Sequence, residues 1–410
     1  MARKMMSDSN PPRLLSFTLD GWPVLGGPVT ISLNDGVAVL VGRNGVGKSA
    51  ILEGFMAITS FASGRNRLRQ IDYENIPNVL NIEVLSPSNR RFAYRYELLK
   101  QINSEDDLSL NSSIEDSPEE EFSWNECCQY LDHNKEIIWK TENGVTIIEN
   151  DNNPITAILG NTSSLQRSNL PENLISKLPI EKLPNEMSWV RSVLRGFRLI
   201  GKRPTRLRLE RDPSFLRVRA NSTRVIPMFS VGDLSSRLPM LIHRLREKED
   251  LDEFESVCQR VGIGNEITEQ QFVRGGKDEE YHIEVFLDGV NVGLLSDGTL
   301  RVLSILLEVI TSSSMETIII EEPEANIHPG MLAKLLNEIE SYTYGQNLML
   351  STHSPQVVSW TKPDKINLVY RENGRTFVQK LRKDEIHNVA CYLNEEGSLG
   401  DWIYSGILDE

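Results

Sequence analysis

Residues Gly42–Ser49 read GRNGVGKS, and the class of fold can be worked out from this loop. It matches the pattern GxxxxGK[ST], in which glycines let the backbone wrap so that its N–H groups face phosphate oxygens. The apolar run Val37–Val41 before it predicts a buried strand, and Ala50–Phe55 after it predicts a helix. A strand, a glycine-rich loop and a helix N-terminus together form a phosphate-binding site.

The residue types in this loop predict how it holds a nucleotide. Backbone groups of Asn44, Gly45 and Gly47 would face the phosphates, and Lys48 would reach the β- and γ-phosphates. The hydroxyl of Ser49 would be a ligand for Mg²⁺. An ordinary glycine-rich turn is the alternative, but the strand before it and the helix after it disfavour that interpretation. We therefore expect ATP and Mg²⁺ as cofactors.

A second motif, Ile318–Glu324 (IIIEEPE), reads as an apolar strand that runs into carboxylates. A parallel strand next to the phosphate loop would bring Glu321 to the Mg²⁺ shell, and Glu322 would then orient or deprotonate the attacking water. Neighbouring strand residues point to opposite faces, so both carboxylates can approach one site only if the strand ends in a turn, here enforced by Pro323. The alternative is a solvated strand terminus.

A third motif, Leu348–Pro355 (LMLSTHSP), is another apolar strand that ends in polar groups. Its spacing after the glutamate-rich strand suits the next strand of the same sheet. His353 could then reach the γ-phosphate or the attacking water, as a catalytic residue beside Glu322 and Lys48. A hydrogen-bonded histidine at a strand end is the alternative.

The fourth motif, Leu295–Arg301 (LSDGTLR), precedes a helix predicted at residues 299–311. Ser-Asp-Gly before an apolar run is also an ordinary helix cap and turn. The position of the motif favours a functional role over a plain helix cap, because Ser296 lies 25 residues before Glu321 with one helix between them.

The four motifs in this order resemble those of the ABC-type ATPases, in the RecF/SMC-like branch and its relatives, the OLD-type ATPases. The resemblance is carried by the signature Leu295–Arg301, by Glu321–Pro329 (EEPEANIHP) and by Ser351–Pro355 (STHSP). It covers residues 13–57 and about 228–408. It implies an α/β fold: an ABC ATPase head with a mixed sheet and a P-loop core, plus an inserted β-rich and basic region.

The resemblance also implies a site shared by two copies of the chain. Ser296 and Gly298 would contact the γ-phosphate of the partner's ATP, and Asn326–His328 would form the loop between the two sites. The dipole of the signature helix would stabilise developing charge across the interface. The usual first carboxylate in the family is Asp, and Glu321 departs from it; Glu is common in the OLD-type branch, so the Mg²⁺ role is kept.

The motifs and the composition between them predict three regions. Residues 1–100 would be a head lobe with the P-loop and antiparallel strands. Residues 101–227 would be an insertion with an acidic loop at 104–121, a hairpin around Asn143-Gly144 and an arginine-rich segment. Residues 228–410 would complete the head with the signature, the acidic strand and the histidine.

The overall composition predicts a cytoplasmic protein with a substantial core. Hydrophobic residues make up 39% and charged residues 25%. No apolar run reaches the roughly 18 residues of a membrane span, and the N-terminus lacks the apolar core of a secretory signal. Four cysteines without CxxC spacing indicate a reducing compartment, and the net charge of −14 disfavours non-specific nucleic-acid binding by the whole surface.

The basic stretch at residues 191–224 has three interpretations. It could be a groove for DNA, a surface for an acidic partner protein, or an arginine face that balances the acidic loop. Arginines alternate in two possible strands, so each pair would share a face: Arg206 and Arg208, Arg217 and Arg219.

Three functions follow from these motifs. The first is an ATPase that dimerises around ATP and controls a separate effector, a nuclease or toxin, in bacterial anti-phage defence. The second is a RecF-like DNA-repair or DNA-binding ATPase, and the third a nucleotide-locked scaffold that sequesters a toxin. OLD enzymes carry a C-terminal Toprim nuclease, whereas only about 50 residues follow Ser351–Pro355, so we expect the effector to be another chain.

Overall fold

The fold is described from a computed structural model of the chain. The described residues are 11–63, 76–100, 122–131, 136–142, 145–148, 155–158, 185–201, 215–219, 234–274, 280–314 and 316–381. The acidic loop 104–121, the turn Asn143-Gly144 and most of the basic stretch 191–224, Arg206 and Arg208 included, lie outside them.

The chain divides into two compact units, and each is described by itself. The first unit comprises residues 1–36, 45–197 and 369–378, and the second comprises residues 37–44, 198–368 and 379–410. The first therefore contains the helix after the P-loop, and the second contains the strand before it. The three regions predicted from the sequence remain a prediction; the expected boundary at residue 100 falls between two strands that pair with each other.

The first unit is built on an antiparallel sheet in the order β2-β1-β4-β5-β6-β7-β8-β9. Its strands are β1 (Arg13–Asp20), β2 (Val29–Ser32), β4 (Val79–Leu85), β5 (Arg91–Lys100), β6 (Phe122–Tyr130), β7 (Ile137–Glu142), β8 (Val145–Ile148) and β9 (Ile155–Ile158). Apolar and polar residues alternate along β4 because one face of the sheet is buried.

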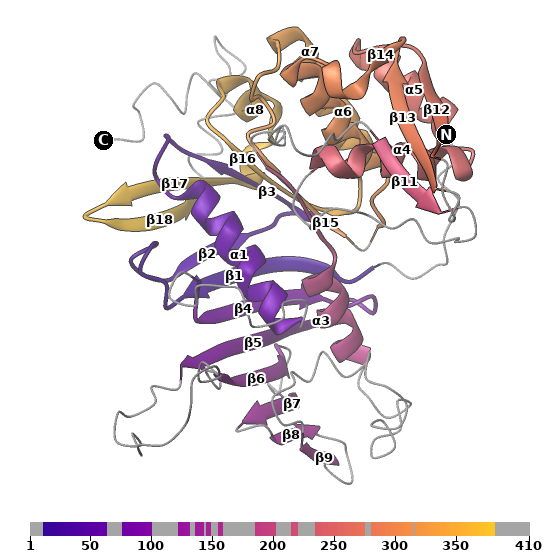
Figure 1. The fold of residues 1–410 in the computed structure, drawn as a ribbon. Coiled ribbons are helices and arrows are strands. Elements are labelled where there is room, and N and C mark those ends of the chain that lie inside the picture. Colours follow the sequence, from indigo (N-terminus) through magenta and orange to yellow (C-terminus); the bar gives the residue numbers. More distant parts are fainter. Residues whose placement is uncertain are drawn as a thin grey trace, which may run out of the picture. The chain divides into compact units, whose positions relative to one another are not determined.

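Among the helices that the structure describes, α1 (Lys48–Ala62) and α3 (Asn185–Arg195) cover this sheet (Figure 1). Phe55 of α1 stacks on Phe17 of β1, with ring centroids 4.0 Å apart. Trp189 of α3 lies 6.3 Å from Phe92 of β5. The contact of Phe55 fixes α1, and therefore the P-loop residues at its N-terminus, on the sheet.

The second unit contains the parallel strands of a sheet in the order β10-β15-β16-β3-β17-β18. The strands are β3 (Val37–Val41), β10 (Phe197–Ile200), β15 (Thr317–Glu321), β16 (Asn347–Thr352), β17 (Ile366–Glu372) and β18 (Arg375–Lys380). β15, β16, β3 and β17 pair in parallel, and β17 and β18 are divided between the two units. Every residue of β15 and β16 is buried, as expected for strands covered on both faces.

The helices of the second unit bury its core against this sheet and against a smaller one. The helices are α4 (Leu234–Glu247), α5 (Leu251–Val261), α6 (Asp297–Ile310), α7 (Pro329–Tyr342) and α8 (Pro355–Trp360), and the smaller sheet comprises β11 (Phe215–Arg219), β12 (Ile267–Arg274), β13 (Glu280–Leu287) and β14 (Val290–Asn291). Leu303 and Leu306 of α6 are fully buried in the same core as Ile318 and Ile320 of β15. α6 is thus held rigidly against the strand that carries the carboxylates.

The predicted α/β class is confirmed, with parallel strands in the sheet that contains β3 and antiparallel pairs in the two other described sheets. The strand predicted at Val37–Val41 has the observed bounds, and the helix predicted at residues 299–311 is observed as α6. The strand β14 (Val290–Asn291) is short, because residues 292–294 form a 3-10 helix before the signature. None of the helices in the described ranges combines the length and apolar character of a membrane span.

Candidate functional site

The carboxyl ends of three strands of the second unit meet at one edge of its sheet. Glu321 at the end of β15 pairs with Ser351 of β16, and Thr352 of β16 pairs with Val41, the last residue of β3. The P-loop begins directly after Val41. The strand order corrects one expectation: β16, and not the acidic strand β15, is the neighbour of the P-loop strand.

The turn after β15 brings adjacent carboxylates to the same edge. Glu322 has a φ of 44°, in the left-handed region that side chains rarely adopt. Its N–H donates to the backbone oxygen of Ser351 at 2.7 Å, which fixes this conformation. The strand alternation that would place Glu322 opposite Glu321 is therefore broken, as Pro323 led us to expect. Backbone strain of this kind is concentrated at functional sites.

His353 lies against the carboxylates of this turn. Its Nδ1 is 3.6 Å from Oε1 of Glu322 and 3.5 Å from Oε1 of Glu324. The same Glu324 oxygen accepts hydrogen bonds from the Thr352 hydroxyl at 2.7 Å and from the His353 N–H at 3.1 Å. Glu324 therefore fixes the end of β16, and through it His353, beside Glu322. The sequence motif contains Glu324, but nothing in its spacing indicated that it would bind the next strand.

Glu321 is suited to hold a hard cation. Its side chain is buried, and its Oε1 has no hydrogen-bond partner within the described part of the chain. A buried, unpaired carboxylate oxygen is costly unless a ligand completes it. The described residues contain no cluster of His, Cys, Asp and Glu that could enclose a metal alone. Magnesium does not need one, because it is commonly held by one or two carboxylates together with phosphates and water.

The first unit presents the other half of the P-loop at the start of α1. Gly47 has a φ of 108°, and a Cβ there would lie 2.8 Å from the Thr376 hydroxyl oxygen. That hydroxyl donates to the backbone oxygen of Val46 at 3.0 Å, so β18 supports the loop. Lys48 is buried at the first position of α1, and Ser49 follows it. Sequence reasoning missed Thr376, since no motif surrounds it.

The signature residues lie at the N-terminus of α6. Ser296 is exposed and caps the helix: its hydroxyl accepts from the Thr299 N–H at 3.2 Å. The capping interpretation is thus confirmed, and the hydroxyl also lies 2.8 Å from the Thr299 hydroxyl. Gly298 is the site of a close approach, because a Cβ there would lie 2.5 Å from the backbone oxygen of Asn326.

The sequence matches, over residues 37–359, the family described as "AAA domain, putative AbiEii toxin, Type IV TA system". The chain belongs to this AAA family. The match runs from the strand before the P-loop to the helix after His353 and so includes all four motifs. The protein is accordingly an ATPase of the AAA type, and ATP binding accounts for the P-loop.

Several solved structures are similar to this AAA protein. The SMC head domain from Thermotoga maritima is 12% identical, with a TM-score of 0.38, covering 90% of this chain and 99% of the other. An Smc head bound to the C-winged helix domain of ScpA is 13% identical, with a TM-score of 0.42 and coverage of 92% and 100%. An Smc head with an extended coiled coil, bound to the C-terminal domain of ScpA derived from Pyrococcus furiosus, is 11% identical, with a TM-score of 0.42 and coverage of 94% and 100%. None of the curated proteins matches the sequence.

Proposed function

We propose that this AAA protein hydrolyses ATP in the cytoplasm, dimerises around the nucleotide and controls a separate effector protein. The observation that carries the proposal is the grouping of Glu321, Glu322 and His353 at the sheet edge where the P-loop begins. A protein that only bound ATP would need neither a buried carboxylate in a strained turn nor a histidine beside it.

Each residue has a task that its surroundings suit. Gly45, Gly47 and Lys48 hold the phosphates, and Asn44 lies exposed in the same loop. Mg²⁺, when bound, neutralises charge on the phosphate oxygens, and Ser49 and Glu321 are the residues that would hold it.

The chemical step would depend on the acidic turn, Glu321–Asn326, and on His353 beside it. Glu322 accepts a proton from the attacking water or orients it, and His353 donates a hydrogen bond to the γ-phosphate or to that water. Ser296 and Gly298 of the partner subunit would contact the γ-phosphate from the other side. The exposure of Ser296 supports this last task.

Two substitutions test the proposal. Lys48→Ala removes the cation that binds the phosphates, so ATP binding and hydrolysis should both be lost. Glu322→Gln keeps the shape of the turn but removes the base, so turnover should fall by about 100-fold or more while ATP still binds. The Glu322→Gln protein should then elute as a dimer from a sizing column with ATP and Mg²⁺. Elution of ATP-bound Glu322→Gln at the nucleotide-free position would contradict the dimer.

The description of the family supports a toxin as the effector. It names a putative AbiEii toxin and a type IV toxin–antitoxin system. We infer that the separately encoded partner is a toxin or nuclease, and an anti-phage role would follow from its release or activation. The same description also favours the scaffold hypothesis, in which the chain holds the toxin and rarely hydrolyses ATP. A complex that survives Lys48→Ala, measured by co-purification, would favour the scaffold over the ATP-gated switch.

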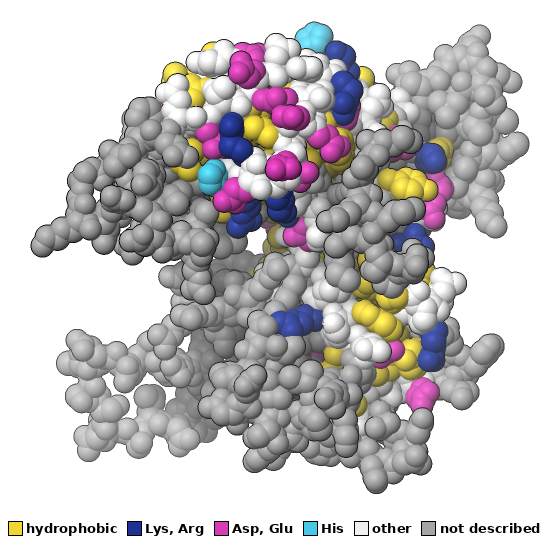
Figure 2. Space-filling view, turned by 90° about the vertical axis from the view of Figure 1, so that its right-hand side faces the viewer, with side chains coloured by type: hydrophobic (Ala, Val, Ile, Leu, Met, Phe, Trp, Pro, Cys, Tyr) yellow, Lys and Arg dark blue, Asp and Glu magenta, His cyan; other side chains and the backbone are white. Residues whose placement is uncertain are grey.

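DNA binding has weaker support. Arg217 and Arg219 belong to a segment that is a strand, β11, and the shared face that their alternation predicts remains a prediction. Acidic side chains lie between Lys and Arg side chains over the upper part of the face in Figure 2. A DNA-stimulated ATPase rate with a steep salt dependence would support the RecF-like alternative.

A further inference from the structure

Arg301 connects three elements of the second unit. It lies on α6, five residues after Ser296, and only 1% of its surface is exposed. One guanidinium nitrogen, Nη2, donates to the backbone oxygen of Glu321 at 2.6 Å. The other, Nη1, donates to the backbone oxygen of Gly201, the residue after β10. Arg301 therefore joins the signature helix to the ends of both β15 and β10.

The burial of this guanidinium is costly. Desolvation lowers the pKa of Arg301 to about 10, and the nearby charges of Glu321, Glu324 and Glu322 oppose that shift. The side chain remains protonated at neutral pH, so a buried cation lies beneath the acidic turn. Its hydrogen bonds go to backbone oxygens, and its charge acts on three carboxylates at once. A leucine or methionine would fill the same space at lower cost, which indicates a task other than packing.

A second contact lies on the same face of α6. Gly298 and Arg301 are three residues apart and so lie one above the other on the helix. Gly298 approaches the backbone oxygen of Asn326, in the turn that follows Glu322. The N-terminal part of α6 thus touches both ends of the acidic turn: Arg301 contacts Glu321, and Gly298 contacts Asn326.

We propose that Arg301 is a positioning residue that couples Ser296 to Glu321 and Glu322. Its contacts make the signature end of α6 and the acidic turn move as one body. A γ-phosphate that engages Ser296 from the partner subunit would then hold Glu322 in its working position. The inference rests on the proposed function, and it explains how a contact made in trans completes a site formed in cis.

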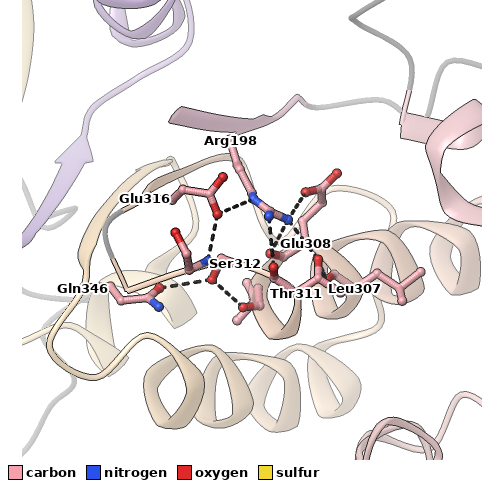
Figure 3. Close-up of polar contacts among 9 residues, drawn as sticks. Arg198, Leu307, Glu308, Thr311, Ser312, Glu316 and Gln346 are labelled. Carbon is pink, nitrogen blue, oxygen red and sulfur yellow. Dashed lines mark hydrogen bonds and ion pairs between the residues drawn. The ribbon is translucent and has the colours of Figure 1, made fainter. Parts of the chain in front are cut away.

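Arg198 supplies a matched control, because this residue of β10 anchors the opposite end of α6. Figure 3 shows this arginine of β10 at the C-terminal end of α6. Its Nη1 and Nε form ion pairs of 2.9 Å with Glu308 and Glu316, and Nη1 also donates to the Thr311 hydroxyl at 2.8 Å. Arg198 and Arg301 both anchor α6 through largely buried guanidinium groups. Only Arg301 lies at the end that carries the signature and contacts the acidic turn.

The test compares Arg301→Met with Arg198→Met in the full-length protein. Three quantities are measured: thermal stability, the Kd for a fluorescent ATP analogue, and kcat with saturating ATP and Mg²⁺ at 20 °C. Both variants should be less stable than the wild type. For Arg301→Met, kcat should fall by about tenfold or more while the Kd changes by less than about threefold. Arg198→Met should keep kcat within about threefold of the wild type.

Arg301→Lys keeps the proposal testable if the methionine variant does not fold. Lysine retains the charge but cannot donate to both backbone oxygens in the fixed geometry of a guanidinium. It should restore folding while kcat stays about tenfold or more below that of the wild type. A wild-type kcat for Arg301→Lys, or an equal loss in the Arg301 and Arg198 methionine variants, would overturn the coupling role. Absence of hydrolysis by the wild type would instead refute the proposed function.

Discussion

At the scale of single residues, Glu324 shows how the site depends on groups outside the nucleotide motifs. Its carboxylate holds Thr352 and the backbone of His353, so the histidine is placed by a side chain from the turn that follows the neighbouring strand. The motifs predicted Glu321, Glu322 and His353, because each is a residue type with direct chemistry toward a nucleotide. They could not predict Glu324, since its partner is set by the parallel register of β15 and β16.

Replacing Glu324 with Ala should slow hydrolysis without weakening ATP binding. His353 would lose the contacts that hold its ring beside Glu322, so kcat should fall by about 10- to 100-fold. Glu324→Gln can still accept both hydrogen bonds and should fall between the wild type and Glu324→Ala. The measurements are kcat at saturating ATP and the Kd of a fluorescent ATP analogue.

The control for this prediction is Glu338→Ala. Glu338 pairs with Arg260 through a bidentate contact on the surface, away from the acidic turn. Its loss should leave kcat unchanged, since exposed ion pairs contribute little. If Glu324→Ala turns over ATP as fast as Glu338→Ala, Glu324 has no part in placing His353.

At the scale of elements, the sequence was most informative where a strand is buried on both faces. Apolar runs such as Val37–Val41 and Thr317–Glu321 are short, continuous and bounded by turn residues, so their ends could be predicted. β6 carries Glu126 and Cys128 on its buried face, and α5 begins among acidic residues. Their patterns are weak because tertiary packing, and not local propensity, decides them.

The contact between α4 and β12 gives a pH-dependent contribution to stability. His243 of α4 lies 3.1 Å from Glu269 of β12, and this hydrogen bond is the main cause that raises the pKa of His243. Burial and Arg246 oppose the shift, and Glu247 adds to it. Because the folded-state pKa lies above the ordinary value of about 6.5, the stabilisation is complete below that pH and is lost as the pH rises through the raised pKa.

His243→Gln should remove this pH dependence. The wild type should gain thermal stability relative to the variant as the pH is lowered from about 8 to 6, by no more than a few degrees since the ring is partly exposed. Melting temperatures of the two proteins, recorded in parallel over this range, measure the difference. A constant difference across the range would show that the His243–Glu269 contact does not depend on protonation of the ring.

At the scale of the whole molecule, the central question is whether one nucleotide is held by two copies of the chain. Lys48 belongs to the first unit and Ser296 to the second. No single-chain feature of the sequence distinguishes a signature that acts in trans from a helix cap, and Ser296 is a cap in the structure. The two tasks are compatible, because Ser296 is an exposed residue although it caps the helix.

Mixing two inactive variants tests the shared site directly. Lys48→Ala removes phosphate binding, and Ser296→Arg blocks the signature, so each homodimer should be inactive. In a mixed dimer, the intact P-loop of the Ser296→Arg chain faces the intact signature of the Lys48→Ala chain, and one site of two is restored. With random pairing about half of the dimers are mixed, so an equimolar mixture should recover about a quarter of the wild-type rate. Recovery should vanish when Lys48→Ala is mixed with a chain carrying both substitutions. If the Ser296→Arg protein is fully active alone, Ser296 has no part in the reaction. If the mixture is as inactive as its components, the two chains do not share a site and the whole reaction belongs to one chain.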